Sequence, residues 1–204
     1  MGAFVVFITL APLKTYLKLY NLLLCIGWTV LLAAYLVNGC ELTHFTLILL
    51  NICQFAAVLE IIHALLKVVS SPVMTTIKQL GSRFLVVVLI DLLKSEEYIG
   101  IGGVTGLHLI MFAWSITEIV RYAFYFTGLI EKEVKTLVFL RYTLFLVLYP
   151  AGVTGELLII FSWMKRDGLS WSANDIIFGI IMLSYFIFFP GMFGHMLSQR
   201  RKKL

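Results

Sequence analysis

Residues 17–37 read LKLYNLLLCIGWTVLLAAYLV, an apolar run in which Lys18 is the only charged residue. A helix of about 20 apolar residues covers the roughly 30 Å of hydrocarbon in a bilayer. The whole chain shares this character, because 61% of its 204 residues are hydrophobic, 13% are charged and the mean hydropathy is +0.99. A soluble domain of this length needs much more polar surface. The sequence therefore predicts an all-α fold, a polytopic transmembrane helical bundle.

We predict that residues 1–204 form a single transmembrane domain with six spans. The spans cover residues 17–37, 45–66, 80–93, 104–130, 136–163 and 175–197. The third predicted span is short and polar at its ends. A five-span chain without it would place the two termini on opposite sides of the membrane.

Positive charges orient the six-span arrangement, because lysine and arginine are enriched in cytosolic loops. One side carries ten of them: Lys14, Lys18, Lys67, Lys78, Lys132, Lys135, Arg200, Arg201, Lys202 and Lys203. The loops on the other side carry three, which are Lys94, Lys165 and Arg166. This asymmetry predicts that both termini lie in the cytosol.

Residues 198–204, SQRRKKL, form a basic cytosolic tail after the last predicted span. Lys202 stands third from the end beside two arginines, which approximates a dilysine retrieval signal. Such a signal would keep a multi-pass protein in the endoplasmic reticulum membrane. A basic flank that stops the last span accounts for the same residues about equally well.

Other compositional features exclude several kinds of site. Cys25, Cys40 and Cys53 do not form a pair with metal-binding or redox spacing. The net charge of +5 comes from lysines and arginines of the loops and does not suggest nucleic-acid binding. We therefore expect neither a metal site nor a nucleic-acid partner.

Ionisable side chains inside the predicted spans need a partner or a cavity, because a charge in hydrocarbon costs several kcal/mol. They are Glu60, His63, Arg83, Asp91, Glu118, Arg121, Arg141 and Glu156. Glu118 and Arg121 are three residues apart and share a helix face, which suits either an internal ion pair or substrate contact. Glu60 and His63 have the same spacing, but a metal would need further ligands. Arg83 and Arg141 lie near cytosolic span ends, where they could reach the interface or bind a polyanion.

The stretch YPAGVTGE runs from Tyr149 to Glu156, two residues that project from nearly the same side of a helix. At 1.5 Å per residue their backbones are about 10 Å apart, so the side chains can converge on a small group. Pro150 removes one helical hydrogen bond, and Gly152 and Gly155 allow another backbone or a ligand to approach closely. The pattern suits a two-group proton-transfer site. It equally suits a structural kink whose tyrosine and glutamate bond to neighbouring helices.

Several segments resemble the 3-hydroxyacyl-CoA dehydratase family of the endoplasmic reticulum, also called protein tyrosine phosphatase-like. They are LEIIHALLKVVSSPV, GSR around Arg83, WSITEIVRY and LRYTLFLVLYPAGVTGE. The resemblance extends from about Tyr16 to the basic tail. It implies six spans with cytosolic ends, and it implies dehydration of a (3R)-3-hydroxyacyl-CoA to the trans-2-enoyl-CoA, the third step of very-long-chain fatty acid elongation.

The resemblance also implies that Tyr149 and Glu156 are catalytic and that Arg83, Arg141 and Gly152 support them. We expect Glu156 to be the base that removes a proton from C2 and Tyr149 to be the acid that protonates the departing C3 hydroxyl. The reverse assignment stays open. The reaction needs no metal or organic cofactor. The expected partners are the long-chain substrate, the lipid bilayer and other fatty acid elongation enzymes.

Two other classes of function compete with this one. A non-enzymatic membrane scaffold for elongation or trafficking partners would not need Tyr149 or Glu156. A small transporter could use the broken fifth span as a binding site, but we find no internal repeat and no second broken span in a matching position. A cysteine phosphatase needs a Cys-x5-Arg motif, and none of the three cysteines has an arginine six residues on.

Overall fold

The computed structural model describes the chain except residues 1, 69–72, 94–96, 167 and 169–171, and it describes residues 2–11, 74–76, 78 and 79 by their backbone alone. The helices are α1 (Gly2–Val37), α2 (His44–Ala56), α3 (Val58–Leu65), α4 (Val73–Leu92), α5 (Gly106–Leu129), α6 (Lys135–Arg141), α7 (Phe145–Arg166) and α8 (Ala173–Lys203). Two short antiparallel strands, β1 (Gly100–Ile101) and β2 (Val104–Thr105), lie between α4 and α5. The predicted helical class is therefore confirmed.

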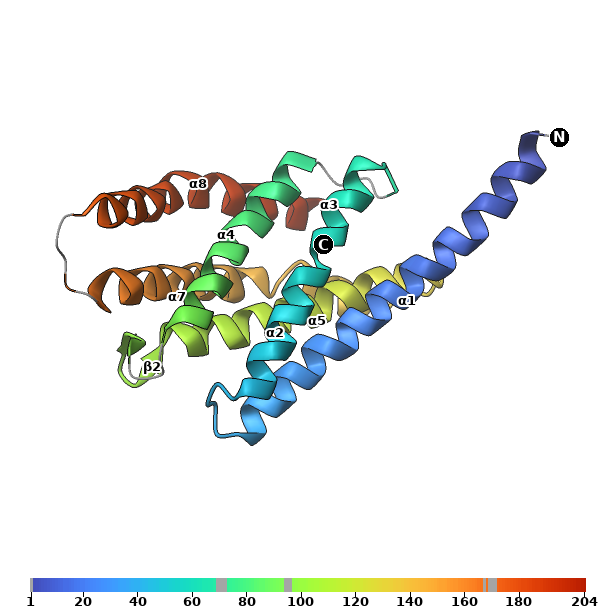
Figure 1. The fold of residues 1–204 in the computed structure, drawn as a ribbon. Helices are drawn as coiled ribbons and strands as arrows, with labels where there is room; N and C mark the ends of the chain where they lie inside the picture. Colours follow the sequence, from blue (N-terminus) through green and yellow to red (C-terminus); the bar gives the residue numbers. More distant parts are fainter. Residues whose placement is uncertain (1, 69–72, 94–96, 167, 169–171) are drawn as a thin grey trace.

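Helix α5 is central to the bundle and makes its most extensive contacts with α1 and α7. Figure 1 shows α4 crossing α7, and α7 lying alongside α8 as an antiparallel pair. The first turns of α1 project beyond the other helices (Figure 1). Helix α8 is peripheral, since none of its residues is buried.

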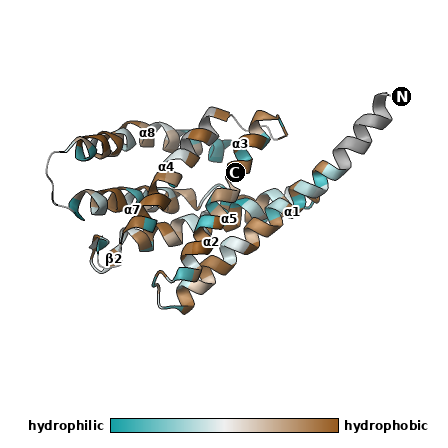
Figure 2. Cartoon of the chain, in the orientation of Figure 1, coloured by the Kyte–Doolittle hydropathy of each residue, from teal (hydrophilic) through white to brown (hydrophobic). Residues whose placement is uncertain are grey.

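Within the part of the chain that the structure describes, five segments are long and apolar enough to cross a membrane. They are Pro12–Val37, His44–Leu65, Gly106–Leu129, Phe145–Arg166 and Ala173–Lys203. Figure 2 shows hydrophobic residues along most of their length. The predicted span 80–93 falls within α4, a 20-residue helix that is not one of these five. A multi-pass membrane protein is thus supported, whereas the sixth span and the cytosolic termini stay predictions.

Two of the predicted spans are interrupted. The span 45–66 corresponds to α2 and α3, which meet at Ala57, whose N–H donates to the Gln54 carbonyl three residues back at 3.1 Å. The span 136–163 corresponds to α6 and α7, separated by a turn at residues 142–144. Pro150 lies inside α7, six residues beyond that interruption. The break therefore precedes Pro150, the position at which the sequence allowed a kink.

Glycines set the distance between α5 and α7. A Cβ placed on Gly155 would lie 2.8 Å from Ile110 Cγ1 and 2.9 Å from the Gly106 carbonyl oxygen. A Cβ on Gly106 would lie 2.8 Å from Leu158 Cβ. The prediction that Gly155 lets another backbone approach is therefore confirmed. At Gly152 the nearest atom to an added Cβ is Ala113 Cβ at 3.6 Å, an ordinary contact.

Candidate functional site

Glu156 points from α7 into the bundle, where it is 7% exposed. Trp114 of α5 donates its indole N–H to Glu156 Oε1 at 3.3 Å, and Tyr185 of α8 donates its hydroxyl to Oε2 at 2.7 Å. Ser82 of α4 also interacts with both Glu156 and Tyr185. Side chains from three neighbouring helices thus surround one carboxylate, and Trp114 and Tyr185 donate to different oxygens.

Tyr149 lies two turns earlier on α7 and also faces α8. Its ring stacks on Phe189, with centroids 5.1 Å apart and planes 8° apart, and on Phe193 at 6.3 Å and 15°. Its hydroxyl forms no hydrogen bond with a described residue. Tyr149 and Glu156 therefore share the side of α7 that their spacing predicts. They do not hydrogen-bond to each other, and it is Tyr185 that contacts the carboxylate.

A second polar cluster begins one side chain away, at Arg83 of α4. The Arg83 guanidinium pairs with Glu118 Oε1 and lies 5.2 Å from the centre of the Trp114 ring. Trp114 is the residue that donates to Glu156, so Arg83 connects the two polar groups of the interior. Glu118 is itself only 2% exposed.

Arg121 completes the second cluster by bridging two carboxylates. It donates from Nε to Glu118 Oε2 at 2.7 Å, and it pairs with Glu60 through Nη1 and Nη2 at 2.6 and 2.7 Å. The Tyr122 hydroxyl donates to Glu60 Oε1 at 2.6 Å. Two arginines and two glutamates are thereby paired. The structure confirms that Glu118 and Arg121 contact each other on one face of α5, and it adds Glu60 and Arg83 as partners.

His63 and Arg141 lie outside this cluster. His63 Nε2 is 2.9 Å from the Tyr16 hydroxyl. Among the described residues there is no group of three metal-ligating side chains. Arg141 ends α6, with its guanidinium 5.9 Å from the centre of the Tyr125 ring. The structure therefore brings Arg83, but not Arg141, close to the residues around Glu156.

Sequence reasoning missed Trp114 and Tyr185 as partners of Glu156. Trp114 stands in the segment that carries the family resemblance, but as one aromatic residue among many. The only sequence signal at Tyr185 is the dipeptide Ser184–Tyr185, which interrupts an apolar run in the last predicted span. Spacing along one helix cannot reveal a partner on another.

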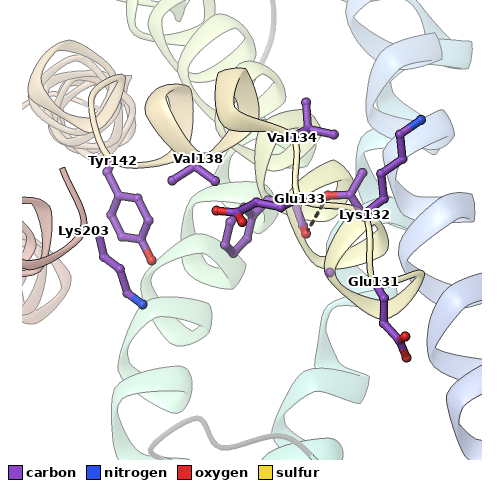
Figure 3. Close-up of a pocket in the computed structure, with 10 residues that line it drawn as sticks. Glu131, Lys132, Glu133, Val134, Val138, Tyr142 and Lys203 are labelled. Atoms are coloured by element: carbon purple, nitrogen blue, oxygen red, sulfur yellow. Dashed lines mark hydrogen bonds between the residues drawn. The ribbon is translucent and has the colours of Figure 1, made fainter.

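A surface pocket of about 400 Å³ lies apart from these residues, where α5 ends and α6 begins. Figure 3 shows Tyr142 and Lys203 on one side of this pocket and Glu131 on the other. Its lining residues are Phe124, Thr127, Gly128, Glu131, Lys132, Glu133, Val134, Val138, Tyr142 and Lys203. Glu131 is paired with Lys14 at 2.6 Å. The pocket thus combines aromatic side chains with charges of both signs, on the side that the charge asymmetry assigns to the cytosol.

The fold and the geometry define a multi-pass helical membrane protein whose interior holds a carboxylate bound by neutral donors and a phenol on the same helix face. Such a pair can take up and release protons beside a ligand. Sequence comparison then gives the family. A family model described as protein tyrosine phosphatase-like protein, PTPLA, matches residues 54–204, and the chain belongs to this family.

Curated relatives match over most of their length. The chain is 38% identical to a very-long-chain (3R)-3-hydroxyacyl-CoA dehydratase of Caenorhabditis elegans, over 94% of this chain and 95% of the relative. It is 39% identical to a probable dehydratase of the same name from Schizosaccharomyces pombe, over 92% and 91%. Human very-long-chain (3R)-3-hydroxyacyl-CoA dehydratase 2 is 37% identical, over 95% and 82%. No solved structure matches the chain. The resemblance drawn from the sequence is therefore confirmed.

Proposed function

We propose that the protein dehydrates a long-chain (3R)-3-hydroxyacyl-CoA to the trans-2-enoyl-CoA, as the third step of very-long-chain fatty acid elongation in the endoplasmic reticulum membrane. The observation that carries this proposal is the buried Glu156, held by two donors beside a tyrosine whose hydroxyl is bound by no described residue. The names of the relatives supply the reaction and the substrate class.

The reaction needs two proton transfers at neighbouring carbons. The Glu156 carboxylate removes a proton from C2, and the electron pair of that C–H bond forms the C2=C3 double bond. The C3–O bond breaks as the Tyr149 hydroxyl donates its proton, so the oxygen leaves as water. The proton on Glu156 then replaces the one that Tyr149 gave up. Every atom is accounted for without an oxidant or a reductant.

The hydrogen bonds at Glu156 favour this assignment over its reverse. An indole N–H can only donate, so Oε1 acts as an acceptor towards Trp114. An ionised carboxylate accepts at both oxygens, which suits the second bond from Tyr185. Tyr149 keeps its proton available because its hydroxyl is not committed to a described neighbour. These contacts support Glu156 as the base and Tyr149 as the acid.

We place the CoA head group at the end of the bundle where α6 begins, and the acyl chain between the apolar helices. Arg141 lies eight residues before Tyr149, at the end of α6 and on the other side of the turn at residues 142–144. Its guanidinium, together with Lys132 and Lys135, can bind phosphate at that rim. In the six-span arrangement this rim is cytosolic. Other elongation enzymes are then the expected partners, since they supply the substrate and consume the product.

The paired cluster of Glu60, Arg83, Glu118 and Arg121 supports the site without taking part in proton transfer. Breaking a buried ion pair leaves a charge without a partner, which is strongly destabilising. The cluster ties α3, α4 and α5 together and holds Arg83 against the ring of Trp114. Gly152 lies beside the same tryptophan, with an added Cβ 3.8 Å from its Nε1. Both features fix the donor that binds Glu156.

The test uses purified protein in detergent with a long-chain (3R)-3-hydroxyacyl-CoA and mass detection of a product lighter by one water. We expect turnover by the unaltered protein and a loss of at least about 100-fold in Tyr149→Phe and Glu156→Gln, since general acid–base groups contribute that much or more. Tyr98→Phe and Glu41→Gln, which lie in the connections at the other end of the bundle, are matched controls that should keep full activity.

Absence of product from the folded, unaltered protein would refute the proposal. Near-normal turnover in either site variant would remove that residue from the mechanism. A scaffold without enzymatic activity predicts the first result, together with normal behaviour of both site variants in cells.

A further inference from the structure

Tyr185 makes a polar contact that its surroundings do not lead one to expect. It lies on α8, a peripheral helix in which no residue is buried. Even so, its hydroxyl donates to Oε2 of the buried Glu156 at 2.7 Å. Among the described residues, the hydroxyl of its neighbour Ser184 bonds within α8, to the Ile181 carbonyl at 2.6 Å. The Tyr185 bond therefore connects the outermost helix of the bundle to the interior.

The two tyrosines around Glu156 differ in what their hydroxyls do. The ring of Tyr149 stacks on Phe189 and Phe193, while its hydroxyl bonds to no described residue. The Tyr185 hydroxyl is committed to the carboxylate. A group that must deliver a proton to a substrate has to be free to meet it. Tyr149 meets this requirement, whereas Tyr185 serves the carboxylate itself.

A glutamate carboxylate held at one oxygen can still turn, because its last torsion angle is broad and roughly two-fold. Here Trp114 of α5 holds Oε1 and Tyr185 of α8 holds Oε2. Two donors on different helices and different oxygens fix the plane of the carboxylate. Ser82 of α4 also interacts with Glu156. Removal of the Tyr185 hydroxyl takes away the 2.7 Å bond at Oε2 and allows the plane to rotate more widely.

We infer that Tyr185 is a positioning residue for the proposed dehydration, which holds the Glu156 carboxylate in the plane from which it removes the C2 proton. The inference rests on the proposed function. It assigns Tyr185 a role through Glu156 and no contact with the reacting atoms. Misplacement of a reacting group by about 1 Å can cost about 100-fold in rate, so the effect belongs to catalysis and not to substrate binding.

The kinetic test compares Tyr185→Phe with Ser184→Ala. We expect kcat of Tyr185→Phe to fall about ten- to a hundredfold, the range for a hydrogen bond to a charged group, with less than about a threefold change in KM. Ser184→Ala removes a hydroxyl from the same helix without touching Glu156 and should match the unaltered protein. An unchanged kcat in Tyr185→Phe, or a loss that appears in KM alone, would overturn the inference.

Infrared spectroscopy detects the hydrogen bond between Tyr185 and Glu156 without an activity measurement. The carboxylate band of Glu156 is identified by its disappearance in Glu156→Gln. We expect this band to shift in Tyr185→Phe and to stay in place in Ser184→Ala, and a band that does not move in Tyr185→Phe would overturn the inference. Replacing Tyr185 with 3-fluorotyrosine, which keeps the ring and is a stronger donor, should shift the band the opposite way even if Tyr185→Phe does not fold. If the unaltered protein fails to dehydrate the substrate, the proposed function is refuted. The infrared measurement still tests whether Tyr185 binds the Glu156 carboxylate.

Discussion

Two glycines of α7 that lie one turn apart should respond differently to alanine. An alanine Cβ at position 155 would sit 2.8 Å from Ile110 Cγ1, whereas ordinary carbon contacts begin at about 3.5 Å. The helices α5 and α7 would have to separate there by about 0.7 Å. At position 152 the nearest atom is 3.6 Å away, so an alanine fits without movement.

The expected magnitudes follow from these distances. Overpacking costs about 1–3 kcal/mol, while replacing glycine by alanine in a helix contributes about 0.5–1 kcal/mol of stability. Gly152→Ala should therefore unfold at the same temperature as the unaltered protein or slightly above it. Gly155→Ala should unfold several degrees lower, since 1 kcal/mol corresponds to about 2–4 °C in a chain of this size.

Gly155→Ala should also reduce turnover. Glu156 is the next residue, and its bond from Trp114 Nε1 is already 3.3 Å long. A separation of about 0.7 Å would lengthen that bond beyond hydrogen-bonding distance. Thermal unfolding of both variants in the same detergent, followed by the dehydration assay, checks the reasoning. Equal unfolding temperatures for Gly152→Ala and Gly155→Ala would refute it.

Three further predictions concern the ion cluster, pH and topology. Arg121→Met leaves the buried Glu118 and the partly buried Glu60 without their shared partner and should cost about 3–5 kcal/mol in thermal unfolding. Lys14→Met at an exposed pair should leave the unfolding temperature unchanged, and equal losses in the two variants would contradict the role of the interior pairs. Burial, together with nearby carboxylates, raises the pKa of the Tyr98 phenol to about 12, so its contribution to stability is fully present below pH 10 and is lost as the pH rises to about 12. Unfolding temperatures measured across that range should fall more steeply for the unaltered protein than for Tyr98→Phe, and parallel curves would speak against this role. The topology test starts from a chain whose own cysteines are replaced by serine and adds Lys67→Cys before α4 or Ile101→Cys after it. If α4 spans the membrane, a membrane-impermeant thiol reagent should label these two positions from opposite sides. Labelling of both positions from the same side would show that α4 does not cross.

The helical class and the site helix could be predicted from the sequence because both depend on local pattern. Apolar runs of membrane-spanning length predicted the long helices, and the seven-residue spacing predicted that Tyr149 and Glu156 share a face of α7. The interruptions at Ala57 and at residues 142–144 were not predicted. Ala57 and residues 142–144, which read YTL, include no glycine, proline, asparagine or aspartate, so the sequence carries no turn signal there.

Partners between helices could not be predicted, because periodicity reports which residues share one helix and not which helices meet. Glu118 and Arg121 were paired correctly since both lie on α5, within one turn. Glu60 and Arg83 reach the same cluster from α3 and α4, and nothing in the spacing links residues 60, 83 and 121. The contact between Tyr185 and Glu156 is of the same kind, because it depends on how α8 packs against α7.

The ion pairs of the glutamates inside the bundle indicate which of them is available for chemistry. Glu60 and Glu118 are each bound to a guanidinium, and the charges of the two glutamates and two arginines cancel. An arginine does not lose its proton in a protein, so each of these two carboxylates is committed to an ion pair. Glu156 forms no ion pair with a described residue, and its partners are a neutral indole, a neutral phenol and the Ser82 hydroxyl. Of these three glutamates, Glu156 is therefore the one that no described arginine or lysine pairs with, so its carboxylate is available to act as the proposed base.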